Sequence, residues 1–504
     1  MNQGLPASIW FILAAFSWLP GANLAVSSII TLFLVACGFG VMWGVLGGSM
    51  PRSGGEYVYN SRILHPTIGL AVSFVNAGFI YLAWIWVLAP WAGQIGLPMM
   101  AGVLGIAPEA VEPFSSGWGL YVVTTIVNVT AFLAVLAGMR VYLKIQKVFT
   151  TWSLIAVVVA GVIFSITSHA EFVSIWNNYA AQFGALDFHA AVRAAAADMG
   201  GIPETWNWTS TLGMMLPVSW IAIYGYIIAF IGGEVKSPRI TIFRAQVLNP
   251  IICIVLLLWV GLAFQRMVGW EGIHAIAWMS EESPEWYAFP FGATYIDMAA
   301  MIVGLNKVVG FIMAGSFIVA TWLWVAASYI AWSRGAFAWG MDGLGPRWFT
   351  DISPRFGQPV KLLVAMLIAS QIAVTHYIMY PETLGALGVT LVELVSVFGV
   401  TAVSCLIFPY VKKVRHIWDV SPYKGWRIGP VPVATIAGGL SLILVGMLTY
   451  AFYVSEGLAF MRDAWTLIYV VIWSLGVGWY FIWKRIRAKE GIDVTLAFKE
   501  IAPE

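Results

Sequence analysis

An acidic residue, Glu393, lies deep within the apolar stretch LGVTLVELVSVFGV. A charged carboxylate inside a bilayer is costly, so such residues are paired with a partner, face a cavity or carry a proton. A carboxyl group that gains and releases a proton can couple proton movement to the movement of another solute. We therefore interpret Glu393 as a candidate coupling residue. The alternative is a protonated acid that forms a hydrogen bond between two helices.

Two further stretches interrupt apolar segments with residues that disfavour a regular helix. The first consists of Gly4, Leu5, Pro6, Ala7 and Ser8, and the second is residues 220–226, WIAIYGY, which include Trp220, Ile223, Tyr224 and Gly225. Unwound backbone at membrane depth is tolerated only where it is buried in protein or lines a cavity. The free N–H groups at the start of a half-helix favour a negatively charged group. Both stretches are therefore candidate sites for a carboxylate, and the alternative for Gly225 is a glycine that lets two helices pack closely.

The composition is that of a protein that crosses the membrane many times. The chain has 504 residues, of which 60% are hydrophobic and 10% are charged, whereas soluble domains contain about 25% charged residues. A membrane-spanning helix needs roughly 20 predominantly apolar residues. We therefore predict an all-α polytopic membrane protein with about twelve spans, at residues 4–20, 23–49, 67–95, 119–139, 146–168, 210–232, 246–265, 307–331, 360–380, 384–409, 430–454 and 464–483.

Other functional classes are disfavoured by what the residues lack. No basic run is interleaved with aromatic residues, so we expect no nucleic acid partner. The cysteines Cys37, Cys253 and Cys405 lie in apolar runs and are expected to be small core residues. We expect no metal site and no cofactor. An intramembrane enzyme is the least favoured class, because nothing resembles a His/Glu metal cluster or a Ser/His pair at one membrane depth.

The basic residues divide unevenly between the predicted loops. Most of the 26 Lys and Arg residues fall on one side of the membrane, the side of the Gly-rich loop at residues 51–66. Cytoplasmic loops carry the excess of positive charge, so we predict a plasma-membrane protein with cytoplasmic N- and C-termini. On the external side, residues 187–199 are expected to form a short helix that Asp187 caps.

Three motifs support a resemblance to a known family. Residues 51–66, PRSGGEYVYNSRILHP, with Gly69 beyond them, resemble the signature loop after the second helix of the amino acid–polyamine–organocation (APC) permeases. Phe230, Gly232, Gly233, Glu234, Lys236 and Pro238 resemble the signature that follows the sixth helix. Ser333, Arg334 and residues 341–346, MDGLGP, resemble a third signature, in which Met341 replaces the usual Arg. The order of the three motifs matches the family.

The resemblance implies a fold of two inverted five-helix repeats and two extra C-terminal helices. We expect the first repeat at residues 1–168, an external loop at 169–209, the second repeat at 210–409, the last two spans at 410–483 and a cytoplasmic tail at 484–504. The first helix of the family is broken in the middle. If residues 4–8 are that break, the first helix is truncated here, and we favour a start assigned too late over a chain that lacks the half-helix.

The resemblance also implies a site. The breaks in spans one and six would bind the substrate carboxylate, Phe79 and Trp84 in span three and Ser328 in span eight would face the site, and Trp220 would close over it from outside. The alternatives are packing or lipid-facing aromatic residues and, for Ser328, a hydroxyl that bonds its own helix backbone. Glu234 is expected to form an ion pair with a nearby Lys or Arg.

We predict a secondary transporter that moves amino acids, of a neutral and apolar or aromatic kind, across the lipid bilayer by alternating access. The coupling ion would be H⁺ or Na⁺. Some proton-coupled relatives carry a Lys in span five where this chain has Ser153, so sodium coupling, exchange and a proton route through Glu393 all stay open. The alternatives are a polyamine or organic-cation transporter with Glu393 as counter-ion, and an amino acid sensor that does not transport.

Overall fold

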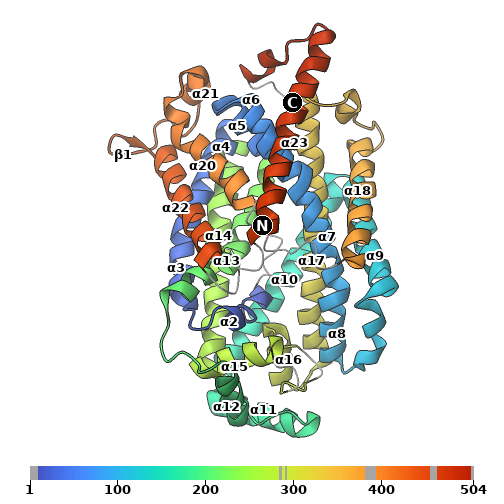
Figure 1. Ribbon diagram of the computed structural model, residues 1–504, viewed down its shortest axis with the longest axis vertical. Coiled ribbons are helices and arrows are strands. Elements are labelled where there is room, and N and C mark those ends of the chain that lie inside the picture. Colours follow the sequence, from blue (N-terminus) through green and yellow to red (C-terminus); the bar gives the residue numbers. More distant parts are fainter. Residues whose placement is uncertain (1–8, 283–285, 290–291, 381–392, 455–461, 501–504) are drawn as a thin grey trace.

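The computed structural model describes residues 9–282, 286–289, 292–380, 393–454 and 462–500. Long helices run along the long axis of the molecule and form one bundle (Figure 1). Within these ranges, ten helices are long and apolar enough to cross a membrane, or eleven if the bent pair Leu394–Tyr410 and Lys412–Asp419 counts as one span. The prediction of an all-α polytopic membrane protein is confirmed.

Some of the membrane-spanning stretches consist of several regular segments, and the others are a single α-helix. In chain order their segments are α3 (Leu24–Phe33), η1 (Leu34–Gly40) and α4 (Val41–Ser49); α6 (Pro66–Ser73), η2 (Phe74–Ile80), α7 (Tyr81–Trp91), η3 (Ala92–Gly96) and α8 (Leu97–Leu104); α9 (Gly117–Leu136); α10 (Met139–Ile166); α13 (Trp208–Ile223) and η6 (Tyr224–Phe230); α14 (Pro238–Val268); α17 (Lys307–Met341); α18 (Val360–Met379); η10 (Leu394–Gly399) and α20 (Val400–Ile407); α22 (Val433–Val454); and α23 (Arg462–Lys489).

Shorter elements connect these helices. They are α2 (Ala15–Trp18), α5 (Glu56–Ile63), η4 (Pro108–Ala110), η5 (Glu112–Phe114), α11 (His169–Phe183), α12 (Phe188–Asp198), η7 (Gly232–Glu234), α15 (Trp270–Glu281), α16 (Tyr295–Ile302), η8 (Arg347–Thr350), η11 (Phe408–Tyr410), η12 (Lys412–Val414), α21 (Arg415–Asp419) and η14 (Val494–Phe498). An antiparallel hairpin of two short strands, β1 (Arg427–Ile428) and β2 (Val431–Pro432), precedes α22.

Local sequence determines where several spans begin. The side chains of Asn23, Asn207 and Asn306 accept hydrogen bonds from backbone N–H groups in the first turns of α3, α13 and α17, which satisfies donors that have no partner within the helix. Pro66 and Pro238 occupy the first positions of α6 and α14, where the missing N–H costs nothing. These signals explain why most predicted spans coincide with observed helices.

The first predicted span, at residues 4–20, is not one continuous helix in its described part. Residues 9–11 are helical, residues 12–14 form a turn, and α2 covers only Ala15–Trp18. The N–H groups of Phe16 and Ser17 bond to carbonyl groups three residues earlier, at 3.1 and 3.0 Å, which is the tighter pattern of a 3-10 turn. The predicted break at residues 4–8 lies outside the described residues, as do residues 384–392 of the predicted tenth span.

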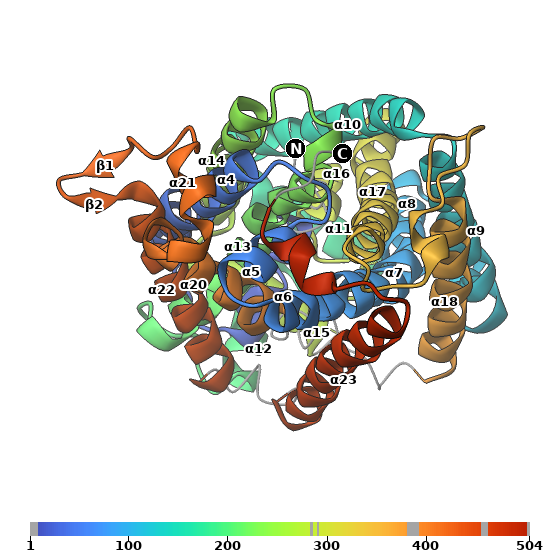
Figure 2. The same ribbon diagram turned by 90° about the horizontal axis from the view of Figure 1, so that it is seen from above.

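The two ends of the bundle differ. The loop at residues 51–66, α5, α6, α21 and the hairpin lie at one end, which we call the basic end (Figures 1 and 2). The helices α11, α12 and α15 lie at the other, which we call the opposite end (Figure 1). There the Asp187 side chain accepts a 3.0 Å hydrogen bond from the Ala190 N–H at the start of α12, so the predicted capped helix is confirmed.

Glycine residues bring α4 and α14 close together. A Cβ atom on Gly40 would lie 2.5 Å from the carbonyl oxygen of Gln246, and one on Gly44 would lie 2.6 Å from the Phe243 ring. Gly40 meets backbone, which cannot move aside as the end of a flexible side chain can. The polar side chains of Gln246 and Asn249 on α14 lie against the junction of α13 and η6, around which the candidate site is built.

Candidate functional site

The sixth predicted span changes its helix type in the middle. The α-helix α13 ends at Ile223 and continues as the 3-10 segment η6 from Tyr224. The freed carbonyl groups of Ala222 and Gly225 accept hydrogen bonds from the side-chain amides of Asn249 and Gln246, at 2.9 and 3.3 Å. The break is therefore buried in protein, and side chains of α14 supply the donors that its backbone lacks.

Both interpretations of Gly225, as a close-packing glycine and as part of the break, require a residue without a side chain at this position. A Cβ atom at this position would lie 2.8 Å from Nδ2 of Asn249, the amide that bonds to Ala222. Any larger residue would push this amide away from the carbonyl group that it satisfies. Gly225 thus acts both as a close-packing glycine and as part of the break.

Glu393 faces this break. Its carboxylate accepts a hydrogen bond of 2.6 Å from the Tyr226 hydroxyl at Oε1 and one of 3.2 Å from the Tyr224 hydroxyl at Oε2. The side chain is fully buried. Among the described residues, Glu393 forms no ion pair with a Lys, Arg or His. A buried carboxyl group with two hydroxyl donors and no cation next to it is a plausible carrier of a proton.

Tyr226 allows either protonation state of Glu393. Its hydroxyl also lies 3.1 Å from Oδ1 of Asn76, so it has two acceptors and one proton to donate. When Glu393 is ionised, the hydroxyl donates to the carboxylate. When Glu393 carries a proton, that proton can be donated to the Tyr226 oxygen while Tyr226 donates to Asn76. Neither state leaves the Tyr226 hydroxyl without an acceptor.

Glu56 is a second buried acid, which sequence reasoning missed. It begins α5 in the Gly-rich loop and is 0% exposed, and its carboxyl group interacts with the Asn76 side chain. Burial, and to a lesser extent the negative charge of Glu393, raise the pKa of Glu56 to about 8. A polar loop sequence gives no sign of this burial, because the loop folds inward instead of lying in solvent.

Three of the predicted site residues meet in one aromatic cavity. Trp84, Trp220 and Tyr224 line a cavity of about 30 Å³, and the other lining residues are Phe11, Leu88, Trp91, Thr321 and Trp324. The ring centroids of Tyr224 and Trp324 are 4.4 Å apart, and those of Trp84 and Tyr224 are 5.7 Å apart. Aromatic side chains therefore fill most of the space. Phe11, Thr321 and Trp324 were not predicted, since an apolar helix gives no indication of which face is turned inward.

A second cavity lies on the other side of Tyr224. It has a volume of about 170 Å³ and is lined by Met139, Tyr142, Leu143, Gln146, Tyr224, Gly225, Ile227, Ile228, Ile231 and Ile330. Because α13 and η6 run from the opposite end towards the basic end, this cavity lies nearer the basic end than the aromatic one. Tyr224 lines both cavities.

Other predicted residues line neither cavity. Ile223 is buried in the core. Phe79 packs against Trp86 with the ring centroids 5.6 Å apart. The Ser328 hydroxyl donates a 3.0 Å hydrogen bond to the Trp324 carbonyl one turn earlier, which is the backbone-bonding alternative that its sequence allowed.

The three sequence motifs meet at the basic end and close it. The Gly54 N–H donates to the Phe230 carbonyl at 3.2 Å, which joins the first motif to the second. Arg334 forms an ion pair of 2.9 Å with Glu234, which joins the second to the third and confirms the role expected for Glu234.

Asp342 is the centre of this closure. Its carboxylate forms ion pairs with Arg52 and with Arg62, each at 2.9 Å, and all three side chains are buried. Separating one partner from a buried ion pair leaves the other charge buried and uncompensated, which is strongly destabilising. The ion pairs therefore hold the 51–66 loop against the end of α17.

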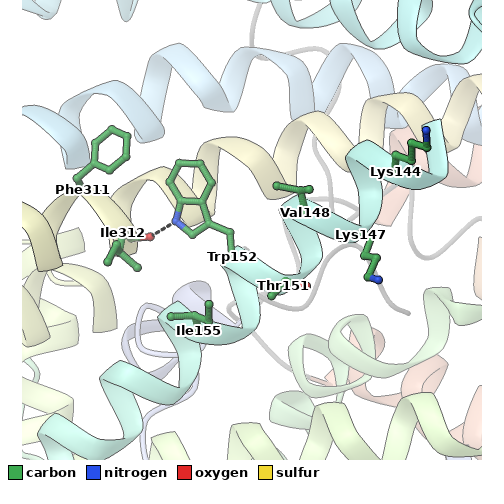
Figure 3. Close-up of a pocket in the computed structure, with 8 residues that line it drawn as sticks. All are labelled: Lys144, Lys147, Val148, Thr151, Trp152, Ile155, Phe311 and Ile312. Atoms are coloured by element: carbon green, nitrogen blue, oxygen red, sulfur yellow. Dashed lines mark hydrogen bonds between the residues drawn. The ribbon is translucent and has the colours of Figure 1, made fainter. Parts of the chain in front are cut away.

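A larger cavity lies elsewhere. It has a volume of about 760 Å³ between α10 and α17, with Lys144 and Lys147 at one end and Trp152 and Phe311 further along (Figure 3). The Trp152 indole N–H donates to the Ile312 carbonyl at 2.7 Å. The walls of this cavity are largely apolar, and Val148 and Ile155 are exposed on the outside of the bundle. The groove does not reach the break and lacks acidic residues, so it is not the candidate site.

Comparisons with known proteins agree with this arrangement. Residues 3–476 match a protein-family model described as amino acid permease. A search of curated proteins found no match.

Proposed function

Because the chain belongs to the amino acid permease family, a family of amino acid transporters, we propose that it is a secondary transporter that works by alternating access. The observation that carries this proposal is the place of Tyr224, which begins the 3-10 segment η6 and lines both cavities. Rotation of this one side chain would join the two cavities or separate them. A substrate held at the break would then reach either end of the bundle in turn.

The substrate in this proposal is a neutral amino acid with an apolar or aromatic side chain. Seven of the eight residues around the aromatic cavity are apolar or aromatic, the exception being Thr321, and none is charged. The backbone at the break in span six would bind the carboxylate, with residues 4–8 contributing from span one. Trp220 would close the cavity from the external side. Phe79, Ile223 and Ser328 are left without a direct contact role.

Glu393 is the coupling residue in this proposal. Its two tyrosine donors, Tyr224 and Tyr226, belong to the same segment that would bind the substrate. A change in the protonation of Glu393 alters what both hydroxyls bond to, and therefore the position of Tyr224 between the cavities. Proton binding and substrate binding would then act on one element, which is what coupling requires. Sodium coupling and exchange are the competing outcomes.

A second candidate substrate is an organic cation such as a polyamine. The observation in its favour is that two buried carboxyl groups, Glu56 and Glu393, form no ion pair within the described residues. Aromatic rings next to them would also stabilise a cation. The neutral cavity around Trp84 and Trp324 favours the amino acid instead.

The proposed orientation places the basic end in the cytoplasm of a plasma-membrane protein, with both termini on that side. The support is the excess of Lys and Arg at this end, as the positive-inside rule requires. Asp187 and α15 would then lie outside.

Uptake by the purified protein in proteoliposomes tests these proposals. A panel of labelled neutral amino acids, arginine and a polyamine would be offered with a proton gradient or a sodium gradient imposed separately. Saturable uptake of one neutral amino acid, driven by the proton gradient and abolished in Glu393→Gln, is the expected result. Proton-driven uptake that Glu393→Gln leaves unchanged would remove Glu393 from the mechanism, and uptake of the polyamine alone would establish the second candidate. If folded protein moves none of these solutes, the sensor becomes the better interpretation.

A further inference from the structure

A pocket at the basic end has no part in the transport mechanism above. Its volume is about 520 Å³, and it lies among α5, α6, η12, α21, α23 and η14. It is lined by Ser61, Arg62, His65, Pro66, Thr67, Lys413, His416, Tyr480, Phe481, Lys484, Thr495, Phe498 and Lys499.

The lining of this pocket carries positive charge and no acid. Lys413, Lys484 and Lys499 come from three separate elements and converge on it. None of the three forms an ion pair with a residue that the structure describes. Asp493, close to the pocket, accepts hydrogen bonds at Oδ1 from the N–H and the hydroxyl of Thr495, at 2.9 and 2.7 Å, and interacts electrostatically with Lys484 and Lys499. Three lysines around one pocket outnumber the single acid that interacts with them, and like charges repel each other, so the pocket favours an anionic ligand.

The inner wall of the pocket is a buried cation. Arg62 is 1% exposed and shares the Asp342 carboxylate with Arg52. Its Nε–H has no hydrogen-bond partner within the described residues. A buried guanidinium N–H without an acceptor costs free energy, and Arg62 adds its positive charge to the wall of the pocket.

A histidine donor and a helix N-terminus complete the pocket. His65 Nδ1 accepts the Thr67 N–H at 3.2 Å at the start of α6, which places the ring proton on Nε2 and leaves that N–H free to donate. The start of α6 also contributes the positive end of its helix dipole. Planar arrays of such N–H donors beside lysines suit the oxygen atoms of a phosphate group.

One wall of the pocket is a membrane helix. Tyr480, Phe481 and Lys484 belong to α23, whose Leu467–Lys489 part is among the membrane-length helices. Phe481 is 50% exposed, and Leu475 and Ile482 are exposed on the same helix. The pocket therefore opens where α23 leaves the apolar layer, at the level of lipid head groups, with an apolar surface below it for an acyl chain.

We propose that this pocket binds the phosphate group of an anionic phospholipid from the leaflet at the basic end. Basic pockets between membrane helices are suited to such head groups. The proposal does not depend on which solute the protein transports.

A bound lipid would fasten the C-terminal segment to the closed basic end. The Ala497 carbonyl of η14 accepts a 3.3 Å hydrogen bond from Arg62, and the Phe498 ring centroid lies 5.2 Å from the Arg62 guanidinium carbon. Figure 2 shows this segment, in red, beside α5 and α6. A phosphate between Lys499 on this segment and Lys413 and Lys484 on the bundle would bridge the two. The lipid would then stabilise the closed state of this end.

Thermal unfolding of the full-length protein in detergent micelles tests the proposal. Phosphatidylglycerol, phosphatidylcholine and glycerol 3-phosphate would be titrated separately into the protein. The test variant is Lys413→Gln/Lys484→Gln/Lys499→Gln. The matched control is Lys236→Gln/Lys412→Gln/Lys489→Gln, because these three lysines are also exposed and none of them lines the pocket.

The expected result is a rise in the Tm of the wild type and the control with phosphatidylglycerol only. Each lysine near an anionic surface contributes about 1 kcal/mol, so the test variant should bind phosphatidylglycerol about 100-fold more weakly. An equal response of the test and control variants would overturn the site. A response to glycerol 3-phosphate as strong as that to the lipid would overturn the lipid as its ligand. If the triple variant does not fold, Lys484→Gln alone should weaken binding about 5-fold, and an unchanged affinity would equally overturn the site.

Discussion

The Tyr226 hydroxyl lies 2.6 Å from Glu393 Oε1 and 3.1 Å from Asn76 Oδ1, so one phenol connects the tenth span to the third. The Tyr226 hydroxyl can donate to only one of these two oxygen atoms at a time. The protonation state of Glu393 therefore determines whether Tyr226 donates to Glu393 or to Asn76. This relationship is the most specific support in the molecule for a proton-dependent step.

Tyr226→Phe should separate proton coupling from substrate binding. The variant removes the hydroxyl and keeps the ring contacts with Phe398 and Trp43. We expect proton-driven uptake to fall at least about 10-fold, as loss of a hydrogen bond to a charged group is worth roughly 1.5–3 kcal/mol, while exchange without a gradient is largely kept. Uptake and exchange would be measured in the same proteoliposomes. Equal losses in both assays would argue for a structural role of the hydroxyl.

Trp84→Ala should weaken substrate binding, and Phe79→Ala should not. Trp84 lines the aromatic cavity, whereas Phe79 packs against Trp86 outside it. Loss of an aromatic contact to the substrate predicts a rise in KM of about 10-fold for Trp84→Ala, corresponding to roughly 1.4 kcal/mol. The Tm of both variants would show whether they are folded. A larger KM effect for Phe79→Ala would mean that the substrate does not occupy this cavity.

Asp342→Asn should destabilise the protein strongly. It leaves the buried guanidinium groups of Arg52 and Arg62 without their shared carboxylate, and such a loss costs about 3–5 kcal/mol. The matched control is Asp351→Asn, whose partner Lys361 is 63% exposed, so that pair should contribute no more than about 1 kcal/mol. Unfolding in detergent with a denaturant gives both values, and similar losses for the two variants would contradict the closure described here.

His274 should make the opposite end sensitive to acid. Its Nε2 accepts the Gly21 N–H and its Nδ1–H donates to the Trp270 carbonyl, both at 2.9 Å, so the neutral ring is the bound form. Burial lowers the pKa of His274 below its usual 6.5. The unfolded chain therefore binds the proton more readily, and the stabilisation is complete above about pH 6.5 and is lost as the pH falls, by at most about 1.4 kcal/mol per pH unit.

The measurement for His274 is Tm as a function of pH between 7.5 and 5.5. His274→Gln keeps an acceptor for Gly21 that does not titrate, so its Tm should fall less than that of the wild type over this range. Parallel curves for the two proteins would show that other groups cause the acid sensitivity.

Features determined by nearby residues could be predicted from the sequence. The Asp187 cap, the starts of spans at Asn23 and Asn207, and the membrane-length helices all depend on a few consecutive residues. The ion pair of Glu234 was also predictable, because its motif places many basic residues at the same end.

Features that depend on the rotation of a helix could not be predicted. In a helix without a polar face, nothing distinguishes Trp324, which lines the cavity, from Ser328, which bonds its own backbone one turn later. The burial of Glu56 has a similar cause. The Gly-rich loop turns inward through positive φ angles at Gly54 and Gly55, 113° and 56°, against the Phe230 ring.

The amides of Gln246 and Asn249 have a consequence for the empty transporter. They belong to the protein and not to the solute, so in the proposed cycle the hydrogen bonds to the carbonyl groups of Ala222 and Gly225 persist after the substrate leaves. The free-energy cost of changing the helix type at this point is incurred once, during folding, and not in each cycle of the proposed transport. In the proposed cycle, the return step would therefore start from a site that already has the geometry for the next substrate molecule.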